Sequence, residues 1–253
     1  MARASHVDDA DYQLADLVAA ESWHFWFRAR RGLVTWMIAR SFPRFGSLLE
    51  VGCGTGYLLG DLRGRFPGAV LAGCDILFDS LRYARPRLPR GLVFQADARR
   101  LPIARRFDVV IALDVIEHLD EDVAALREMF RVVEPGGGVV LTVPQHQWLW
   151  SATDEFSRHR RRYNRAELLA KTRAAGFEVL RCTSFFTATL PLIALQRLAR
   201  PGDDSEPVSE LRISRAVNAA AALMLRPEWW LIKAGISMPI GSSLLVVARR
   251  PAA

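Results

Sequence analysis

The stretch Ser47-Leu-Leu-Glu-Val-Gly-Cys-Gly-Thr-Gly-Tyr57 decides the fold of this chain. Its apolar first half has the length and composition of a buried strand in a parallel sheet. Three glycines, spaced Gly52-x-Gly54-x-Gly56, come next, and because they lack a Cβ atom their backbone N–H groups can approach a ligand closely. Apolar residues at helical spacing resume at Tyr57. A strand, a glycine turn and a helix N-terminus together predict a site for a nucleotide-like or carboxylate-bearing ligand.

The spacing of the glycines excludes two common phosphate-binding turns. A dinucleotide fingerprint has its third glycine where this chain has Tyr57, and a P-loop needs a Gly-Lys-Ser/Thr sequence that the turn lacks. An acidic residue, Glu50, instead precedes the first glycine by two positions. This combination closely resembles the first motif of the class I S-adenosylmethionine-dependent methyltransferases.

The composition is that of a globular chain with a buried core. Of 253 residues, 51% are hydrophobic and 24% are charged, and this length suits one α/β domain with about one accessory segment. The net charge of +7 is carried mostly by arginine, a bias that often follows genome composition, so charge alone is weak evidence for a nucleic-acid partner. An anionic substrate or an acidic membrane surface would use the same positive field. The chain has three cysteines and no C-x-x-C motif, and its N-terminus has no apolar run typical of a signal peptide. These features predict a cytoplasmic protein. Contact with the inner face of the membrane is left open as an alternative.

Three later apolar runs each end in an aspartate, at Asp75, Asp97 and Asp114. Asp75 lies about 20 positions past the glycines, where a carboxylate can accept hydrogen bonds from both ribose hydroxyls. The family resemblance implies that Asp97 accepts from the adenine amino group. The residues assigned in this way to S-adenosylmethionine, and to the product S-adenosylhomocysteine, are Glu50, Gly52, Cys53, Gly54, Thr55, Gly56, Asp75, Ile76, Asp97, Ala98, Asp114 and Val115.

The N-terminal segment is predicted to be one helix from Tyr12 to Ser41, with an aromatic and basic run at Trp23–Arg31. The resemblance implies a helical lid over the cofactor, in which Arg28 or Arg31 would clamp the methionine carboxylate. The alternative is a helix that packs its aromatic side chains on the edge of the domain.

A loop at residues 144–164 follows the fifth strand and is dense in polar and aromatic side chains. Its place at the carboxyl end of the sheet suits an acceptor pocket, whereas a solvated arginine run beside tryptophans on the domain edge is the plainer alternative. A histidine is suited to removing a proton from a hydroxyl acceptor. The candidate catalytic residues are His146, Asp154, His159 and Tyr163.

The segment Asp114-Val-Ile-Glu-His-Leu119 resembles the fourth motif of ubiquinone-type methyltransferases. Its D-x-x-E-H order is similar to the E-x-x-E-H of ubiquinone-pathway O-methyltransferases, and this resemblance implies a divalent metal on Asp114, Glu117 and His118. The favoured alternative is that Glu117 and His118 orient the loop beside the cofactor.

We therefore expect an α/β fold with a doubly wound, seven-stranded, mostly parallel sheet of the Rossmann-like methyltransferase type. Residues 1–46 should form the lid, 47–182 the cofactor-binding core, 183–241 an apolar helical insertion, and 242–253 an antiparallel last strand and tail. The insertion could be a lid, a dimer surface or a membrane-interface segment. The sequence does not determine the oligomeric state.

The acceptor is narrowed by motifs that are missing. Methylation of a base amine usually uses Asp/Asn-Pro-Pro-aromatic after the fourth strand, and carbon-5 pyrimidine methylation needs a cysteine nucleophile that typically follows proline; neither is present. We expect O- or N-methylation of a small-molecule or lipid-linked acceptor. The alternatives are a nucleic-acid or protein methyltransferase and an inactive cofactor-binding scaffold.

Overall fold

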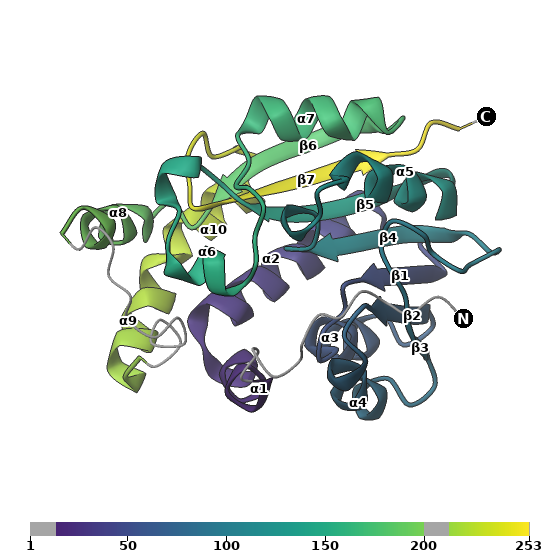
Figure 1. Cartoon of the computed structure of the whole chain (residues 1–253), viewed down its shortest axis with the longest axis horizontal. Coiled ribbons are helices and arrows are strands. Elements are labelled where there is room, and N and C mark those ends of the chain that lie inside the picture. The colour runs from purple at the N-terminus through teal and green to yellow at the C-terminus, as the bar shows by residue number, and fades with distance from the viewer. Residues whose placement is uncertain (1–13, 200–212, 253) are drawn as a thin grey trace.

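The computed structural model describes residues 14–199 and 213–252, which form one sheet covered by helices on both faces (Figure 1). The sheet has seven strands in the order β3-β2-β1-β4-β5-β7-β6. The strands are β1 (Ser47–Val51), β2 (Val70–Asp75), β3 (Leu92–Gln95), β4 (Phe107–Leu113), β5 (Val133–Pro144), β6 (Glu178–Phe185) and β7 (Ser243–Arg249). The helices are α1 (Leu14–Trp23), α2 (Phe25–Ser41), α3 (Tyr57–Arg65), α4 (Phe78–Arg87), α5 (Asp122–Val132), α6 (Ala152–Phe156), α7 (Arg165–Ala174), α8 (Leu190–Ala199), α9 (Arg215–Met224) and α10 (Arg226–Lys233).

The predicted sheet is confirmed. The central strand β1 is buried throughout and pairs in parallel with β2 and β4, as expected for an unbroken apolar run covered on both faces. The last strand, β7, runs antiparallel between β5 and β6. On one face, α5 and α7 bury Leu126 and Leu168, and on the other α2 and α3 bury Val34 and Leu59.

Two predicted boundaries were wrong for reasons of tertiary contact. The expected single N-terminal helix breaks at His24, whose extended backbone and side chain cap α2 at Trp26 N. The sequence Glu134-Pro-Gly-Gly-Gly138 predicts a turn before the fifth strand, but it is part of β5, which begins at Val133. Pairing with the C-terminal tail draws this segment into the sheet, since Gly136 N donates to Arg250 O at 3.0 Å.

The predicted insertion is helical where it is described, as α8, α9 and α10. The acidic, proline-bounded sequence at residues 201–207 predicts a linker within the insertion, and it lies outside the described residues. Glu228 of α10 is buried and accepts hydrogen bonds from the backbone N–H groups of Phe186, Thr187 and Ala188. This carboxylate ties α10 to the end of β6. Among residues 14–199 and 213–252, no helix is both long enough and apolar enough to span a bilayer.

Candidate active site

The glycine turn after β1 leaves one position open to a ligand. Gly52, Gly54 and Gly56 all have a positive φ, of 71°, 49° and 78°, which L-residues with a side chain rarely adopt. A Cβ atom on Gly52 would collide with Val115, and one on Gly56 would come within 2.9 Å of Ala84. A Cβ atom on Gly54 would meet no atom within 4 Å. The turn is therefore a cradle whose open side lies at Gly54.

Two buried carboxylates flank this cradle. Asp75, at the end of β2, accepts hydrogen bonds from Gly54 N at 2.7 Å and from Leu77 N at 2.8 Å, which holds the turn in place. Glu50 lies inside β1, and its Oε2 is buried without a hydrogen-bond partner. Burial raises the pKa of Glu50 well above its usual value. An unpartnered buried carboxyl oxygen beside an open cradle fits a polar ligand such as S-adenosylmethionine.

The N-terminal helices close over the same turn. The hydroxyl of Thr55, in the turn, donates to the Glu21 carboxylate of α1, and the Tyr57 hydroxyl donates to Val18 O at 3.3 Å. Arg31 donates to Glu21 O at 2.6 Å and to the Asp61 carboxylate at 2.8 Å. Helix α1 thus lies against the cofactor turn, and Arg31 fastens it to α3.

The arginine that reaches the strand ends is Arg30, which the sequence analysis missed. Its guanidinium pairs with the Asp114 carboxylate, lies 4.2 Å from the Trp26 ring centroid, and keeps a buried Nε without a hydrogen-bond partner. Arg28 is exposed. Helical spacing could have separated the two, because Arg30 follows buried Phe27 by three positions and precedes buried Val34 by four.

Asp114 and Asp97 have different surroundings. Asp114 ends β4 with a left-handed φ of 54°, and its Oδ1 accepts from the Thr142 hydroxyl at 2.9 Å. Asp97 is half-buried and accepts from the Arg99 guanidinium at 2.6 Å, which lowers the pKa of Asp97. The other assigned residues lie beside these: Cys53, Thr55 and Ala98 are buried, and Ile76 and Val115 are half-buried.

The loop at residues 144–164 is closed at its base. His146 N donates to Tyr163 O at 3.0 Å, and Tyr163 N donates to Pro144 O at 2.9 Å. The centre of the loop is Asp154, which is 1% exposed and accepts from Arg162 Nε at 2.8 Å and Nη2 at 2.7 Å. Asp154 also caps α6 through Ser151. The loop is therefore built around one buried carboxylate.

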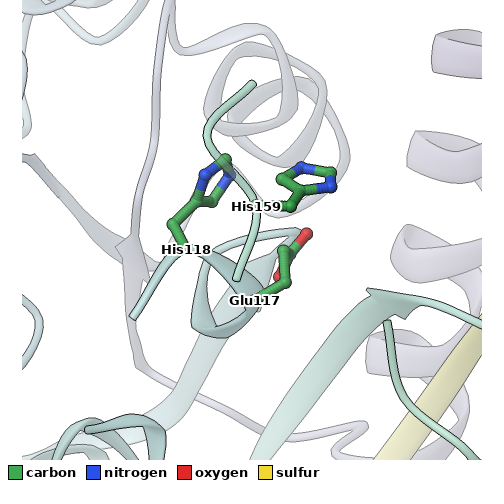
Figure 2. A group of neighbouring side chains, drawn as sticks. All are labelled: Glu117, His118 and His159. Atoms are coloured by element: carbon green, nitrogen blue, oxygen red, sulfur yellow. The ribbon is translucent and has the colours of Figure 1, made fainter. Parts of the chain in front are cut away.

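Three side chains from this loop and from the end of β4 form what we call the histidine cluster: Glu117, His118 and His159 (Figure 2). One ligand atom from each lies within 4.8 Å of the others, and the two imidazole centroids are 4.6 Å apart. His159 Nδ1 lies 2.8 Å from Asp154 Oδ1. If Nδ1 carries the proton, the ionised Asp154 accepts it and the Nε2 lone pair of His159 remains available.

Burial controls the charges in the cluster. Both carboxyl oxygens of Glu117 are buried without a hydrogen-bond partner, and burial, followed by the nearby Asp114, raises the pKa of Glu117 well above its usual value. Burial, followed by the neighbouring His159, lowers the pKa of His118 to about 4. At neutral pH, His118 is therefore an uncharged imidazole that can accept a hydrogen bond or bind a metal.

The other two candidate catalytic residues lie outside the cluster. Tyr163 is fully buried, and its hydroxyl donates to Asp122 at 2.6 Å; burial and this bond raise the pKa of Tyr163 far above its usual value. His146 packs against Trp148, with 5.4 Å between ring centroids, and its Nε2 is buried without a partner. Of the four candidate catalytic residues, His159 and Asp154 are therefore the pair whose side chains meet.

The donor set of the cluster also fits a divalent transition-metal ion. Two imidazoles and one carboxylate are a common ligand set for such ions, and the Asp154–His159 contact would orient one ligand. Asp114, which the resemblance had included, is not in this group among the described residues, because its carboxylate bonds to Arg30 and Thr142 instead.

Comparisons with known proteins agree with this architecture. Residues 49–141 match the family described as a methyltransferase domain. The chain is 32% identical over 162 residues to an S-adenosylmethionine-dependent methyltransferase of Mycolicibacterium smegmatis, a match that covers 62% of this chain and 60% of that protein. It is 29% identical over 251 residues to another of Mycobacterium tuberculosis, covering 90% of this chain and 85% of that one. Other relatives are named for small-molecule acceptors, trans-aconitate and an amino-sugar nucleotide.

The fold also occurs with the product of the cofactor bound. The N-methyltransferase NodS of Bradyrhizobium japonicum, solved in complex with S-adenosylhomocysteine, has a TM-score of 0.54 to this chain and 16% identity, covering 89% of this chain and 87% of that one. At that identity the likeness concerns the fold alone. Residues 49–141 thus match a methyltransferase domain, and the relatives and the sheet order support a class I S-adenosylmethionine-dependent methyltransferase.

Proposed function

We propose that the protein transfers the methyl group of S-adenosylmethionine to an oxygen or nitrogen of a small-molecule or lipid-linked acceptor. One juxtaposition carries this proposal. Glu117 and the Asp154–His159 pair lie just beyond the end of β4, and Val115, in the same segment, adjoins the glycine cradle at Gly52. An acid–base group beside a cofactor cradle is what acceptor methylation requires.

The chain's own residues have separable roles in this proposal. Glu50, Asp75 and the turn at Gly54 would hold the cofactor, and Arg30 would face its carboxylate in place of Arg28 or Arg31. When bound, S-adenosylmethionine supplies an electrophilic methyl group on a sulfonium. His159 Nε2 would take the proton that the acceptor loses as it is methylated, and S-adenosylhomocysteine would be the product.

Orientation of the base is assigned to Asp154. An ionised carboxylate on Nδ1 holds the imidazole in the tautomer that can accept a proton at Nε2, and it stabilises the imidazolium that forms. We assign Tyr163 to the packing of the loop rather than to chemistry, because its hydroxyl is committed to Asp122. A divalent ion, if bound, would be held by the histidine cluster and would supply Lewis-acid activation of an acceptor hydroxyl.

The small-molecule or lipid-linked class is supported by the relatives named for small acceptors and by the missing nucleic-acid motifs. We place the protein in the cytoplasm, at the inner face of the membrane when the acceptor is lipid-linked.

Calorimetric titration tests the proposal in two steps. S-adenosylmethionine and S-adenosylhomocysteine should bind wild type with micromolar affinity. Asp75→Ala should lose this binding, while Asp79→Ala, at a half-buried residue of α4 whose side chain is 45% exposed, should keep it. Transfer of a labelled methyl group is then assayed on phenols and on polyprenyl-linked sugars, with His159→Gln as the inactive control. Cofactor binding with no transfer to any acceptor class would support the scaffold alternative, and no binding at all would refute the proposal.

A further inference from the structure

Helix α9 is apolar in sequence but has no buried residue. Its segment Arg215–Met224 consists mainly of alanine, leucine, valine and methionine, and Val217 and Leu223 are 55% and 58% exposed. An apolar helix in a globular domain normally buries one face against the core. Helix α9 instead presents its apolar side chains to the surroundings.

The exposed apolar surface continues along α10 and the segment after it. Trp230 is 78% exposed, the highest value among the large hydrophobic side chains of the described residues. We define the α9–α10 face by its exposed large apolar side chains: Val217, Leu223, Met224, Trp230, Leu231, Ile236 and Ile240. Such a concentration of exposed apolar side chains marks an interaction surface.

The charges on this face have one sign. Between residues 213 and 241 the ionisable side chains are Arg215, Arg226, Glu228 and Lys233. The single acid, Glu228, is buried and bonded to the backbone after β6, so the exposed charges are all positive. Exposed leucine and tryptophan with arginine and lysine suit the interface of a bilayer that contains acidic lipids.

A groove beside this face adds a place for a polar headgroup. It has a volume of about 320 Å³ and lies between α2, α3 and α10, with Trp36 and Trp229 among its walls. Its charged lining residues are Arg65, Lys233 and Asp61, and the carboxylate of Asp61 is paired with Arg31. Neither Arg65 nor Lys233 forms an ion pair among the described residues. Gly32 lets Trp229 lie against α2, because a Cβ atom there would be 2.7 Å from the indole.

The face is also connected to the lid. Asn218 of α9 accepts a hydrogen bond from Phe25 N at 2.6 Å and donates to Trp23 O at 3.2 Å. These two bonds hold both sides of the break between α1 and α2. The carboxyl ends of the parallel strands point toward the side of the molecule on which α6, α8 and α9 lie (Figure 1). A surface bound to the α9–α10 face would therefore lie beside the candidate active site.

We infer that the α9–α10 face docks on the surface of an acidic phospholipid bilayer and thereby presents the active site to an acceptor carried in that bilayer. The presentation of the active site to an acceptor rests on the proposed function, whereas the docking on the bilayer does not. The bilayer is favoured over a second copy of the chain because the positive charges of the face would repel one another across a symmetric contact.

Vesicle sedimentation of the full chain tests the docking. The protein should bind vesicles of phosphatidylcholine with phosphatidylglycerol, and bind pure phosphatidylcholine at least about fivefold more weakly, since each cation near an acidic surface contributes roughly 1 kcal/mol. Trp230→Glu should lower the partition coefficient at least about tenfold. The matched control is Leu92→Glu, because this side chain is 60% exposed and its strand, β3, lies at the opposite end of the molecule from α9 (Figure 1).

Three outcomes would overturn the inference: no binding of wild type to acidic vesicles, equal losses in the Trp230 and Leu92 variants, or a dimer in solution that Trp230→Glu dissociates without any vesicle binding. Calorimetry separates this failure from that of the proposed function. Trp230→Glu should bind S-adenosylmethionine as wild type does, so lost vesicle binding with intact cofactor binding concerns the docking face alone.

Discussion

Replacement of Asp154 by asparagine tests the centre of the acceptor loop. The substitution preserves the shape of the side chain but removes the charge that meets His159 at 2.8 Å and Arg162 at 2.7 Å. It should therefore reduce both stability and turnover. The matched control is Glu155→Gln, because Glu155 is the neighbouring acid and is exposed.

The size of the stability effect follows from the pKa of Asp154. Burial alone would raise this pKa, but the hydrogen bonds from His159 and Arg162 outweigh burial and lower it from 3.8 to about 2. At about 1.4 kcal/mol per pKa unit, the ionised carboxylate stabilises the fold by roughly 2.5 kcal/mol at neutral pH. Because the folded-state pKa is the lower one, this contribution is complete above about pH 4 and is lost as the pH falls toward 2.

Thermal and denaturant unfolding at several pH values measure this effect. At pH 7, Asp154→Asn should melt about 5–10 °C below wild type, since 1 kcal/mol shifts a chain of this size by about 2–4 °C. The difference should narrow between pH 4 and 2. Methyl transfer should fall about 100-fold or more, because a base that is no longer oriented loses most of its contribution. A melting temperature within 1 °C of wild type, or unchanged transfer in the folded variant, would refute the reasoning.

Three further predictions concern the cradle, the lid and the histidine cluster. Gly54→Ala should weaken S-adenosylmethionine binding at least about tenfold in calorimetry and lower the stability of the fold by about 1–2 kcal/mol. Gly56→Ala should destabilise the fold more in thermal unfolding, because its Cβ would collide with α4. A larger loss of stability in Gly54→Ala than in Gly56→Ala would contradict the cradle. Arg30→Ala should lower cofactor affinity about tenfold or more and exposed Arg28→Ala should not, so equal effects in the same titration would argue against the clamp. Treatment with EDTA should leave methyl transfer unchanged, since a carboxylate-oriented histidine needs no ion; a loss of activity that Zn²⁺ or Mn²⁺ restores would assign a metal to the cluster.

Much of the fold follows from local pattern. Strands β1, β2 and β4 are buried along most of their length, and a strand covered on both faces is an apolar run that can be recognised without its neighbours. The glycine spacing also specified the turn, because glycine adopts the positive φ found at Gly52, Gly54 and Gly56 far more readily than residues with a side chain. The position of Asp75 beside Gly54 follows from the parallel pairing of β1 and β2.

Local pattern was insufficient where a boundary depends on distant partners. Nothing near His24 shows that α1 and α2 separate there, and the break is held by Asn218, almost 200 residues later. The strand β5 starts early because the tail after β7 pairs with it. Both contacts depend on segments that meet only in the folded chain.

The sequence by itself determined the sheet, the glycine cradle and the kinds of residue available for chemistry, because these depend on spacing along the chain. Only the tertiary structure decided which residues meet. Arg30 rather than Arg28 reaches Asp114, because it lies on the buried side of α2. His159 joins Glu117 because a closed loop built on Asp154 returns it to the end of β4. Such pairings depend on helix orientation and loop closure, which arise from packing across the whole domain.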